Sequence, residues 1–167
     1  MKPELTQDSV LDKYDISLLA ALQRDAHATN QQLGEVVYLS ASQVSRRIQR
    51  LEALGLIDRY VALLNPARLG LGVRAISYVT LSHHGDEEGS SFERDILTIP
   101  EVLECFAVTG ESDYILNIFA ASLNDLSESV LKRLTRLKGV SHIRSNIVLQ
   151  SVKSTTELPL SHLSKSG

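Results

Sequence analysis

The chain has almost no cysteine, and this limits its covalent chemistry. Its 167 residues include one cysteine, Cys105, so neither an internal disulfide nor a cysteine-based metal site can form within the chain. Such cysteine usage is typical of a reducing compartment. We interpret Cys105 as a small core residue.

Long apolar runs are also missing. No segment approaches the ~18 consecutive apolar residues that a membrane span requires, and residues 1–10 lack the apolar stretch of a secretory leader. We therefore expect a cytoplasmic protein with no membrane contact, whose first ten residues form an unstructured polar lead-in.

The sequence has neither an excess of positive charge nor the common catalytic motifs. Its net charge of -3 excludes a nonspecific nucleic-acid coat, so any nucleic-acid contact must come from a local patch. There is no Gly-x-Ser-x-Gly elbow, no Gly-x-Gly-x-x-Gly fingerprint and no phosphate loop, and we expect no enzyme, no catalytic residue and no cofactor. His83 and His84 are adjacent and would point apart at a strand end, so we expect no metal site.

Three capped helices are predicted in the first third of the chain. Asp12 is placed to cap a helix that carries Asp15 in its first turn, where the helix dipole favours a carboxylate. Two further segments begin with the S/T-x-x-E/Q spacing of a capping box, at Thr29 and at Ser40. Each segment has apolar residues at helical spacing: Ile16, Leu19 and Leu22; Leu33, Val36 and Val37; and Val44, Ile48 and Leu51.

The second and third predicted helices flank a turn at residues 38–40, and this arrangement indicates a helix-turn-helix. Gly55 is placed to end the third helix. The outer side of the third helix begins with small polar residues and continues with arginines, with no carboxylate before Glu52. Small residues let a first turn approach base edges, and arginines can reach phosphates or guanine. We predict that this face binds double-stranded DNA through Ser40, Ala41, Ser42, Gln43, Ser45, Arg46, Arg47, Gln49 and Arg50. Alternatively, the arginines only solvate a surface helix.

Beyond the third helix, residues 56–63 are rich in branched and apolar side chains and predict a strand. Turn-forming residues cluster at 65–72 and predict a domain boundary. We predict a helix-turn-helix domain with exit strand at 1–63, a linker at 64–72, a ligand-binding and oligomerisation domain at 73–153, and a C-terminal tail at 154–167.

The second half alternates strands and helices. Strands are predicted at 75–82, 102–109, 114–120 and 140–149, and helices at 91–99 and 124–137, the latter capped by Asn124. A polar loop is expected at 83–90 and a tight hairpin connection at 110–112. This order predicts an α+β ferredoxin-like βαββαβ fold with two helices on one face of the sheet. We expect a second copy to cover the other face, which makes a homodimer.

Four collinear segments resemble the Lrp/AsnC family, the leucine-responsive and asparagine-responsive regulators also called feast/famine proteins. They are LDKYDISLLAALQRDA at 11–26, LSASQVSRRIQRLEALGLIDRYVALLNP at 39–66, PEVLECFAVTGESDYIL at 100–116 and KGVSHIRSNIVLQSVKSTTELPL at 138–160. The resemblance implies a sequence-specific DNA-binding transcription regulator that responds to a free amino acid, with tetramers or octamers as larger assemblies. Family members often have alanine where this chain has Gly34 and glycine where it has Tyr38. Gly34 is expected to weaken its helix by up to ~1 kcal/mol.

The resemblance also implies that the effector binds between subunits near residues 109–114. A zwitterion needs donors for its carboxylate and an acceptor for its ammonium; Gly110 exposes backbone N–H groups, and Glu111 and Asp113 are acceptors. Ser145 lies on the last strand, where family members often carry threonine, while Ile143 replaces a polar family position. The predicted effector residues are Thr109, Gly110, Glu111, Ser112, Asp113, Tyr114 and Ser145.

Two alternatives stay open at this point. The segment 110–113 is also what an ordinary hairpin turn requires. The chain could instead be an amino-acid-sensing module that regulates a partner enzyme by contact, although such a module has no need for residues 40–50.

Overall fold

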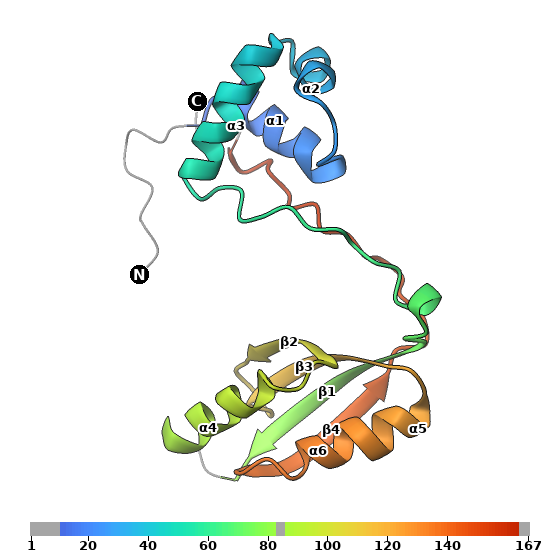
Figure 1. Cartoon of the computed structure of the whole chain (residues 1–167). Helices are drawn as coiled ribbons and strands as arrows, with labels where there is room; N and C mark the ends of the chain where they lie inside the picture. Colours follow the sequence, from blue (N-terminus) through green and yellow to red (C-terminus); the bar gives the residue numbers. More distant parts are fainter. Residues whose placement is uncertain (1–10, 83–85, 164–167) are drawn as a thin grey trace. The chain divides into compact units, whose positions relative to one another are not determined.

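The computed structural model describes residues 11–82 and 86–163, and it divides into two compact units (Figure 1). The first unit contains the helices before residue 62 together with residues 153–163, and the second contains residues 63–152. The expectations for residues 1–10, for His83 and His84, and for the last four residues of the tail lie outside the described residues.

The first unit contains α1 (Lys13–Arg24), α2 (Asn30–Val37) and α3 (Ala41–Ala53). Each begins with a reciprocal capping box, formed by Asp12 with Asp15, Thr29 with Gln32, and Ser40 with Gln43. After α3 the chain reverses at Gly55, whose φ is 69°. There the N–H of Leu56 donates to the carbonyl of Leu51 at 3.0 Å and the N–H of Gly55 to that of Glu52 at 2.9 Å, which is a Schellman motif.

The core of this unit is formed by six buried residues, Leu18, Leu22, Leu33, Val37, Val44 and Leu51. Two of the predicted apolar stripes were correct only in part, since Leu22, Leu33 and Val37 are buried as predicted and Leu19 packs against this core. On α1 the buried positions are Asp15, Leu18 and Leu22, so the inward side is shifted from the predicted one and begins with a carboxylate. On α2 Val36 is 64% exposed, because Leu33 and Val37, one helical turn apart, already occupy the side that faces the core.

The strand predicted at residues 56–63 is not formed. A strand requires a neighbouring strand for its hydrogen bonds, and all four strands of the described chain pair with one another in the second unit. Residues 56–63 instead lead without regular structure to a short 3₁₀ turn, η2 (Ala67–Leu69), which ends at Gly70 with φ 82°.

The second unit has the predicted ferredoxin-like order. Its elements are β1 (Val73–Leu81), α4 (Asp86–Ile96), β2 (Val102–Ala107), β3 (Tyr114–Ala120), α5 (Leu123–Asp125), the π-helical η3 (Leu126–Leu131), α6 (Lys132–Leu134) and β4 (Val140–Ile147). The sheet order is β2-β3-β1-β4, and each neighbouring pair is antiparallel. The helices lie on one side of the sheet (Figure 1). This confirms the predicted fold class.

Two local expectations in this unit were wrong, and a third element is helical as predicted but with a different local geometry. Residues 86–90 are the first turns of α4 rather than a loop; the remaining loop residues 83–85 lie outside the described residues. Ser122 rather than Asn124 caps the second helical segment, because the Ser122 hydroxyl accepts the N–H of Asp125 at 3.0 Å. The middle of that segment is π-helical, yet Leu126, Val130 and Leu134 remain buried.

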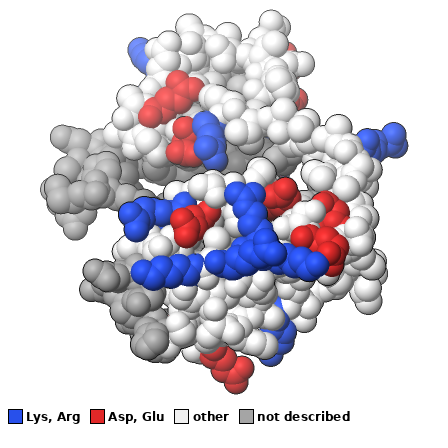
Figure 2. All heavy atoms as spheres, turned by 60° about the horizontal axis from the view of Figure 1, so that its bottom comes forward, with Lys and Arg blue, Asp and Glu red and all other residues white. Residues whose placement is uncertain are grey.

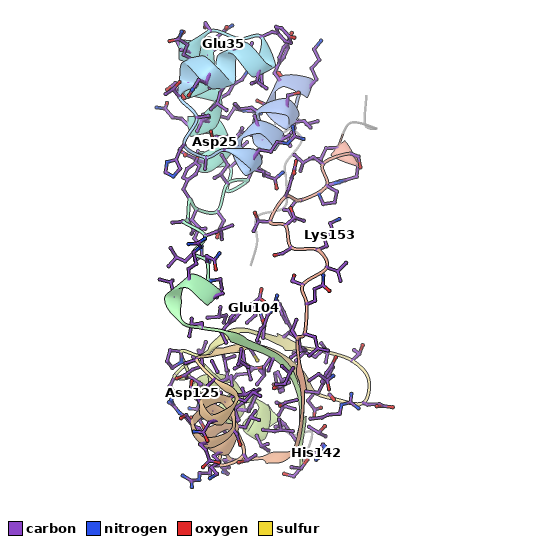
Figure 3. All side chains as sticks on the ribbon, turned by 90° about the vertical axis from the view of Figure 1, so that its right-hand side faces the viewer. Asp25, Glu35, Glu104, Asp125, His142 and Lys153 are labelled. Atoms are coloured by element: carbon purple, nitrogen blue, oxygen red, sulfur yellow. The ribbon has the colours of Figure 1, made fainter. Side chains whose placement is uncertain are left out.

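The two faces of the sheet differ in character. The helix-covered face contains the core of the unit, including Phe92, Leu116 and Ile118. The opposite face, which we call the open face, carries two rows of side chains that the strand register aligns across the sheet: Phe106, Ile115, Tyr78 and Arg144 in one, and Glu104, Asn117, Ile76 and Asn146 in the other. Figure 3 shows Glu104 on the open side and Asp125 in the helical layer.

Candidate DNA-binding and effector-binding sites

The outward side of α3 contains a face of small and polar residues. Ser42, Ser45, Arg46 and Gln49 recur at helical spacing and therefore lie along one side of the helix; we call them the recognition face. Arg46 is exposed and forms no ion pair with any residue in 11–82 or 86–163. Its guanidinium and the Gln49 amide are the groups of this face that can read bases by paired hydrogen bonds.

Arg47 and Arg50, also predicted for DNA, are bound within the unit. The Asp15 carboxylate, only 1% exposed, accepts from Arg47 Nη1 at 2.6 Å and from Arg50 Nη1 at 3.1 Å. Arg47 Nη2 also lies 2.8 Å from Asp12 Oδ2. The two arginines thus fasten α3 to the first turn of α1, and their charges are opposed by carboxylates.

The ionisation of this cluster follows from its geometry. Burial raises the pKa of Asp12, but the N–H of Asp15 and the Arg47 guanidinium oppose this and leave the pKa lowered overall. The hydrogen bond from Arg47 to Asp15 is the main reason that the pKa of Arg47 is raised. Both shifts favour the charged forms, so the ion pairs persist at neutral pH.

The remaining predicted DNA-binding residues lie at the start of α3. Ser40 and Gln43 use their side-chain oxygens in the capping box, with the Ser40 N–H donating to Gln43 Oε1 at 2.9 Å. Ala41 and Ser42 are exposed. The first turn therefore presents little bulk, as close approach to base edges requires.

Residues 153–163 belong to the helix-turn-helix unit, which sequence patterns did not indicate. The Leu158 N–H donates to Gln23 Oε1 at 2.6 Å and its carbonyl accepts from Gln23 Nε2 at 3.3 Å. Arg24 pairs with Glu157 at 3.0 Å. These contacts hold part of the predicted tail against the end of α1.

A cavity of about 680 Å³ lies at the loop end of the open face. We call it the effector cavity; it is lined by Tyr78, Ala107, Val108, Thr109, Glu111, Ser112, Ile115 and Arg144. The Arg144 guanidinium carbon lies 4.8 Å from the centroid of the Tyr78 ring, a distance at which a cation is attracted to the aromatic face. The cavity thus has a cation on β4, a carboxylate on the loop and an apolar wall on the sheet.

Only some of the predicted effector residues reach this cavity. Thr109, Glu111 and Ser112 line it, and Gly110 lies between them with φ 124°. Asp113 Oδ2 accepts the Leu81 N–H at 2.7 Å, and Asp113 is not among the residues that line the cavity.

Two further predicted effector residues lie on the helix-covered face. Tyr114 is buried there and donates to Glu93 at 3.0 Å, so that burial first and this carboxylate second raise its pKa to about 12. Ser145 is 2.7 Å from the hydroxyl of the buried Ser77.

Sequence reasoning missed Tyr78 and Arg144. They lie on two strands that are distant in sequence and become neighbours only through the β1–β4 register, in which Tyr78 is opposite Arg144. Side chains alternate between the two faces of a strand, so the strand predicted at 75–82 could have placed Tyr78 on the face opposite Val79 and Leu81.

Basic residues gather at the end of the second helical segment of this unit, at residues 132–138. Lys132, Arg133, Arg136 and Lys138 are all exposed, and Figure 2 shows a band of Lys and Arg side chains on the side of the molecule that it brings forward. Arg133 donates to the carbonyl of Thr98 at 2.9 Å, and Lys132 pairs with Glu128. The end of this helical segment is therefore polar and exposed.

Neither a membrane span nor a metal cluster is present in the described chain. None of its helices has the length and apolar character needed to cross a membrane. Within residues 11–82 and 86–163, no three His, Cys, Asp or Glu side chains are grouped so that they could hold a metal ion.

A capped helix-turn-helix joined to a ferredoxin-like unit with a cavity on its sheet defines a ligand-responsive DNA-binding regulator. The AsnC-type helix-turn-helix domain family matches residues 11–52, and the Lrp/AsnC ligand binding domain family matches residues 74–158. The chain belongs to the Lrp/AsnC family of transcription regulators, which confirms the resemblance found in the sequence.

Individual relatives match nearly the full length of the chain. The DNA-binding transcriptional activator DecR of Escherichia coli is 34% identical, over 90% of this chain and 99% of its own. A crystal structure of a transcriptional regulator from Neisseria meningitidis in complex with L-Met is 41% identical and has a TM-score of 0.88, covering 92% of this chain and 99% of its own. A feast or famine regulatory protein from M. tuberculosis complexed with L-methionine is 32% identical with a TM-score of 0.77, over 89% and 98% of the two chains.

Proposed function

We propose that the chain regulates transcription by binding operator DNA through the recognition face of α3, and that a free amino acid in the effector cavity modulates this binding. The observation that carries the effector assignment is the cavity itself, in which Arg144 and Glu111 provide opposite charges beside an apolar wall. A free amino acid has a carboxylate, an ammonium and a side chain that require these three features. L-Met complexes of two similar regulators support this choice.

We assign separate roles to the groups of the cavity. Arg144 binds the effector carboxylate, with backbone N–H groups near Gly110 as further donors. Glu111 accepts from the ammonium. Tyr78 and Ile115 contact the side chain, so apolar amino acids, methionine first among them, bind more tightly than charged ones.

The effector proposal is tested by thermal-shift screening of the twenty amino acids. A ligand that binds only the folded state stabilises it by RT ln(1 + [L]/Kd), so the effector raises the melting temperature in a concentration-dependent way. Arg144→Met should weaken the binding of the best ligand by about ten- to a hundredfold, because it removes a charge-assisted hydrogen bond. Arg136→Met, which removes an exposed arginine of the helical layer, is the matched control. Equal ligand affinity of the two variants would exclude Arg144 as the carboxylate site.

For DNA, we propose that Arg46 and Gln49 read bases or phosphates directly, whereas Arg47 and Arg50 orient α3. Arg46→Ala should cost about 1 to 3 kcal/mol in operator binding, with relaxed sequence preference if Arg46 contacts a base. If Arg46 contacts a phosphate, Arg46→Ala should bind all DNA sequences more weakly by the same factor. The salt dependence of its DNA affinity should then become shallower by about one counterion. The probe is a DNA duplex selected by the wild-type protein from a randomised pool. Unchanged binding of that duplex by Arg46→Ala would remove Arg46 from the interface.

A further inference from the structure

The turn between α2 and α3 contains a strained residue. Tyr38 has φ 58° and ψ 46°, in the left-handed region, and it is the one non-glycine residue with positive φ in residues 11–82 and 86–163. This conformation costs a non-glycine residue free energy that glycine does not lose. A strained residue that persists in a turn calls for a compensating role.

The folded unit offers no such compensation for the Tyr38 side chain. The residue is 90% exposed, and its hydroxyl has no hydrogen-bond partner in the described ranges 11–82 and 86–163. The turn itself is held by backbone bonds, in which the N–H groups of Tyr38 and Leu39 donate to the carbonyl of Gly34. Glycine or asparagine would make the same bonds with less strain.

The position of Tyr38 indicates the missing partner. It precedes Ser40, the N-cap of α3, by two residues, on the stretch of chain that leads into the recognition helix. In a helix-turn-helix complex the first helix of the motif crosses the DNA backbone and the recognition helix lies in the major groove, so the turn that joins them lies beside the backbone. A phenol hydroxyl is a donor, and tyrosine is among the side chains that contact phosphates.

We propose that Tyr38 is a DNA-positioning residue whose hydroxyl donates a hydrogen bond to a backbone phosphate beside the site occupied by α3. This inference rests on the proposed DNA-binding role of the recognition face. The phosphate contact fixes the register of α3 and carries no base preference of its own.

The test compares Tyr38→Phe, which removes only the hydroxyl, with Tyr38→Asn, which also relieves the left-handed strain. Dissociation constants are measured for the full-length protein on the selected duplex and on a scrambled duplex, over a series of salt concentrations. Both variants should bind both duplexes about tenfold more weakly than wild type, because a hydrogen bond to a charged group is lost. The salt dependence should not change, because no cationic group is removed. Tyr38→Asn should be at least as thermally stable as wild type, so weaker binding cannot result from unfolding.

Two controls separate this inference from the proposal for the recognition face. Tyr60→Phe removes a half-exposed hydroxyl elsewhere in the unit, where it bonds Glu52 at 3.1 Å, and should leave binding unchanged. Tyr38 variants that bind both duplexes within twofold of wild type overturn the Tyr38 assignment, as does a loss confined to the selected duplex. If Arg46→Ala binds normally while the Tyr38 variants are weakened, the Tyr38 assignment stands and the Arg46 assignment fails.

Discussion

At the scale of single residues, Gly34 shows where intrinsic propensity misleads. Glycine in a helix is expected to destabilise it, and the sequence alone suggested a weakened α2. In the structure Gly34 is buried, and a Cβ atom at this position would lie 2.4 Å from the Leu39 carbonyl oxygen. The turn folds so closely onto α2 that only glycine fits. A tertiary contact of this kind leaves no trace in helix propensity.

Gly34→Ala should therefore destabilise the helix-turn-helix, although alanine is the better helix former. The clash with a backbone carbonyl outweighs the propensity gain of about 1 kcal/mol, and we expect a net loss of about 1 to 3 kcal/mol. Urea unfolding followed by circular dichroism measures this. Gln31→Ala, at an exposed position of the same helix, is the control and should be neutral or slightly stabilising. A Gly34→Ala protein as stable as this control would show that the turn can move away from α2.

The arginines of α3 illustrate the same limit. Their common exposed spacing predicted one basic surface, and the capping boxes that supported this prediction were confirmed. The partner of Arg47 and Arg50 is Asp15, more than thirty residues earlier in the chain, and local spacing could not reveal that pairing.

Arg47→Met and Arg46→Met should differ in stability although the residues are adjacent. Removing Arg47 leaves the buried Asp15 carboxylate with Arg50 as its remaining cation, which should cost about 1 to 3 kcal/mol. Arg46 has no such partner within the described residues, and its removal should change the free energy of unfolding by less than about 0.5 kcal/mol. Chemical denaturation of both variants and of wild type measures these differences in the free energy of unfolding. Equal losses would mean that the Asp15 pairs contribute no net stability.

At the scale of elements, the strongest periodic segments were predicted well and the boundaries less so. β3 matches its predicted range because YILNIFA is an apolar run rich in branched and aromatic residues, bounded by a turn before Tyr114. Residues 56–63 have strand-like composition but no neighbouring strand, and composition cannot supply one. The early start of α4 at Asp86 was hidden by polar residues and Gly89, which resemble a loop in sequence.

The packing of α4 on β3 predicts a pH dependence in alkaline solution. Tyr114 packs against Phe92 with ring centroids 4.6 Å apart and donates to Glu93. Its pKa in the folded state is raised from 10.0 to about 12. A raised pKa means that the stabilisation is fully present below the unfolded value, and it is lost as the pH rises from 10 towards 12.

Wild type should therefore lose roughly 1 to 3 kcal/mol more than Tyr114→Phe over this alkaline range, since phenylalanine has no proton to release. Denaturant unfolding at several pH values measures the difference, and spectrophotometric titration of the phenolate provides an independent reading of the pKa. Parallel pH profiles for the two proteins would show that neither burial nor Glu93 raises the pKa of Tyr114 in the folded protein.

At the scale of the whole molecule, the open face of the sheet needs a cover. Phe106 is 52% exposed on this face, next to Ile115 in the same row. Exposed apolar side chains grouped on a sheet face, here among polar ones, mark an interface, and we propose that a second copy of the chain covers this face in a two-fold dimer. A palindromic operator also requires two helix-turn-helix units, one for each half-site.

Phe106→Glu should shift the full-length protein towards the monomer, because it places a charge in an apolar interface. Sedimentation velocity at micromolar concentration measures the assembly state. Leu97→Glu, at a position 85% exposed just after α4, carries the same change in charge on the helical side and should assemble like wild type. An unchanged sedimentation coefficient for Phe106→Glu would place the interface elsewhere.

The two proposed sites lie in different units of one chain, so their communication can be measured as a coupling free energy. An effector alters DNA affinity only by binding two states of the assembly unequally, and the coupling is reciprocal. We expect methionine, or the best ligand of the thermal-shift screen, to change operator affinity by about 5- to 150-fold, which corresponds to about 1 to 3 kcal/mol. Operator DNA should change the affinity for that amino acid by the same factor. Titrating each ligand with and without the other tests this on wild type, Arg144→Met and the control Arg136→Met. Arg144→Met should bind operator normally without effector and lose the response to it. A full response in Arg144→Met would show that the amino acid acts from a site other than the effector cavity.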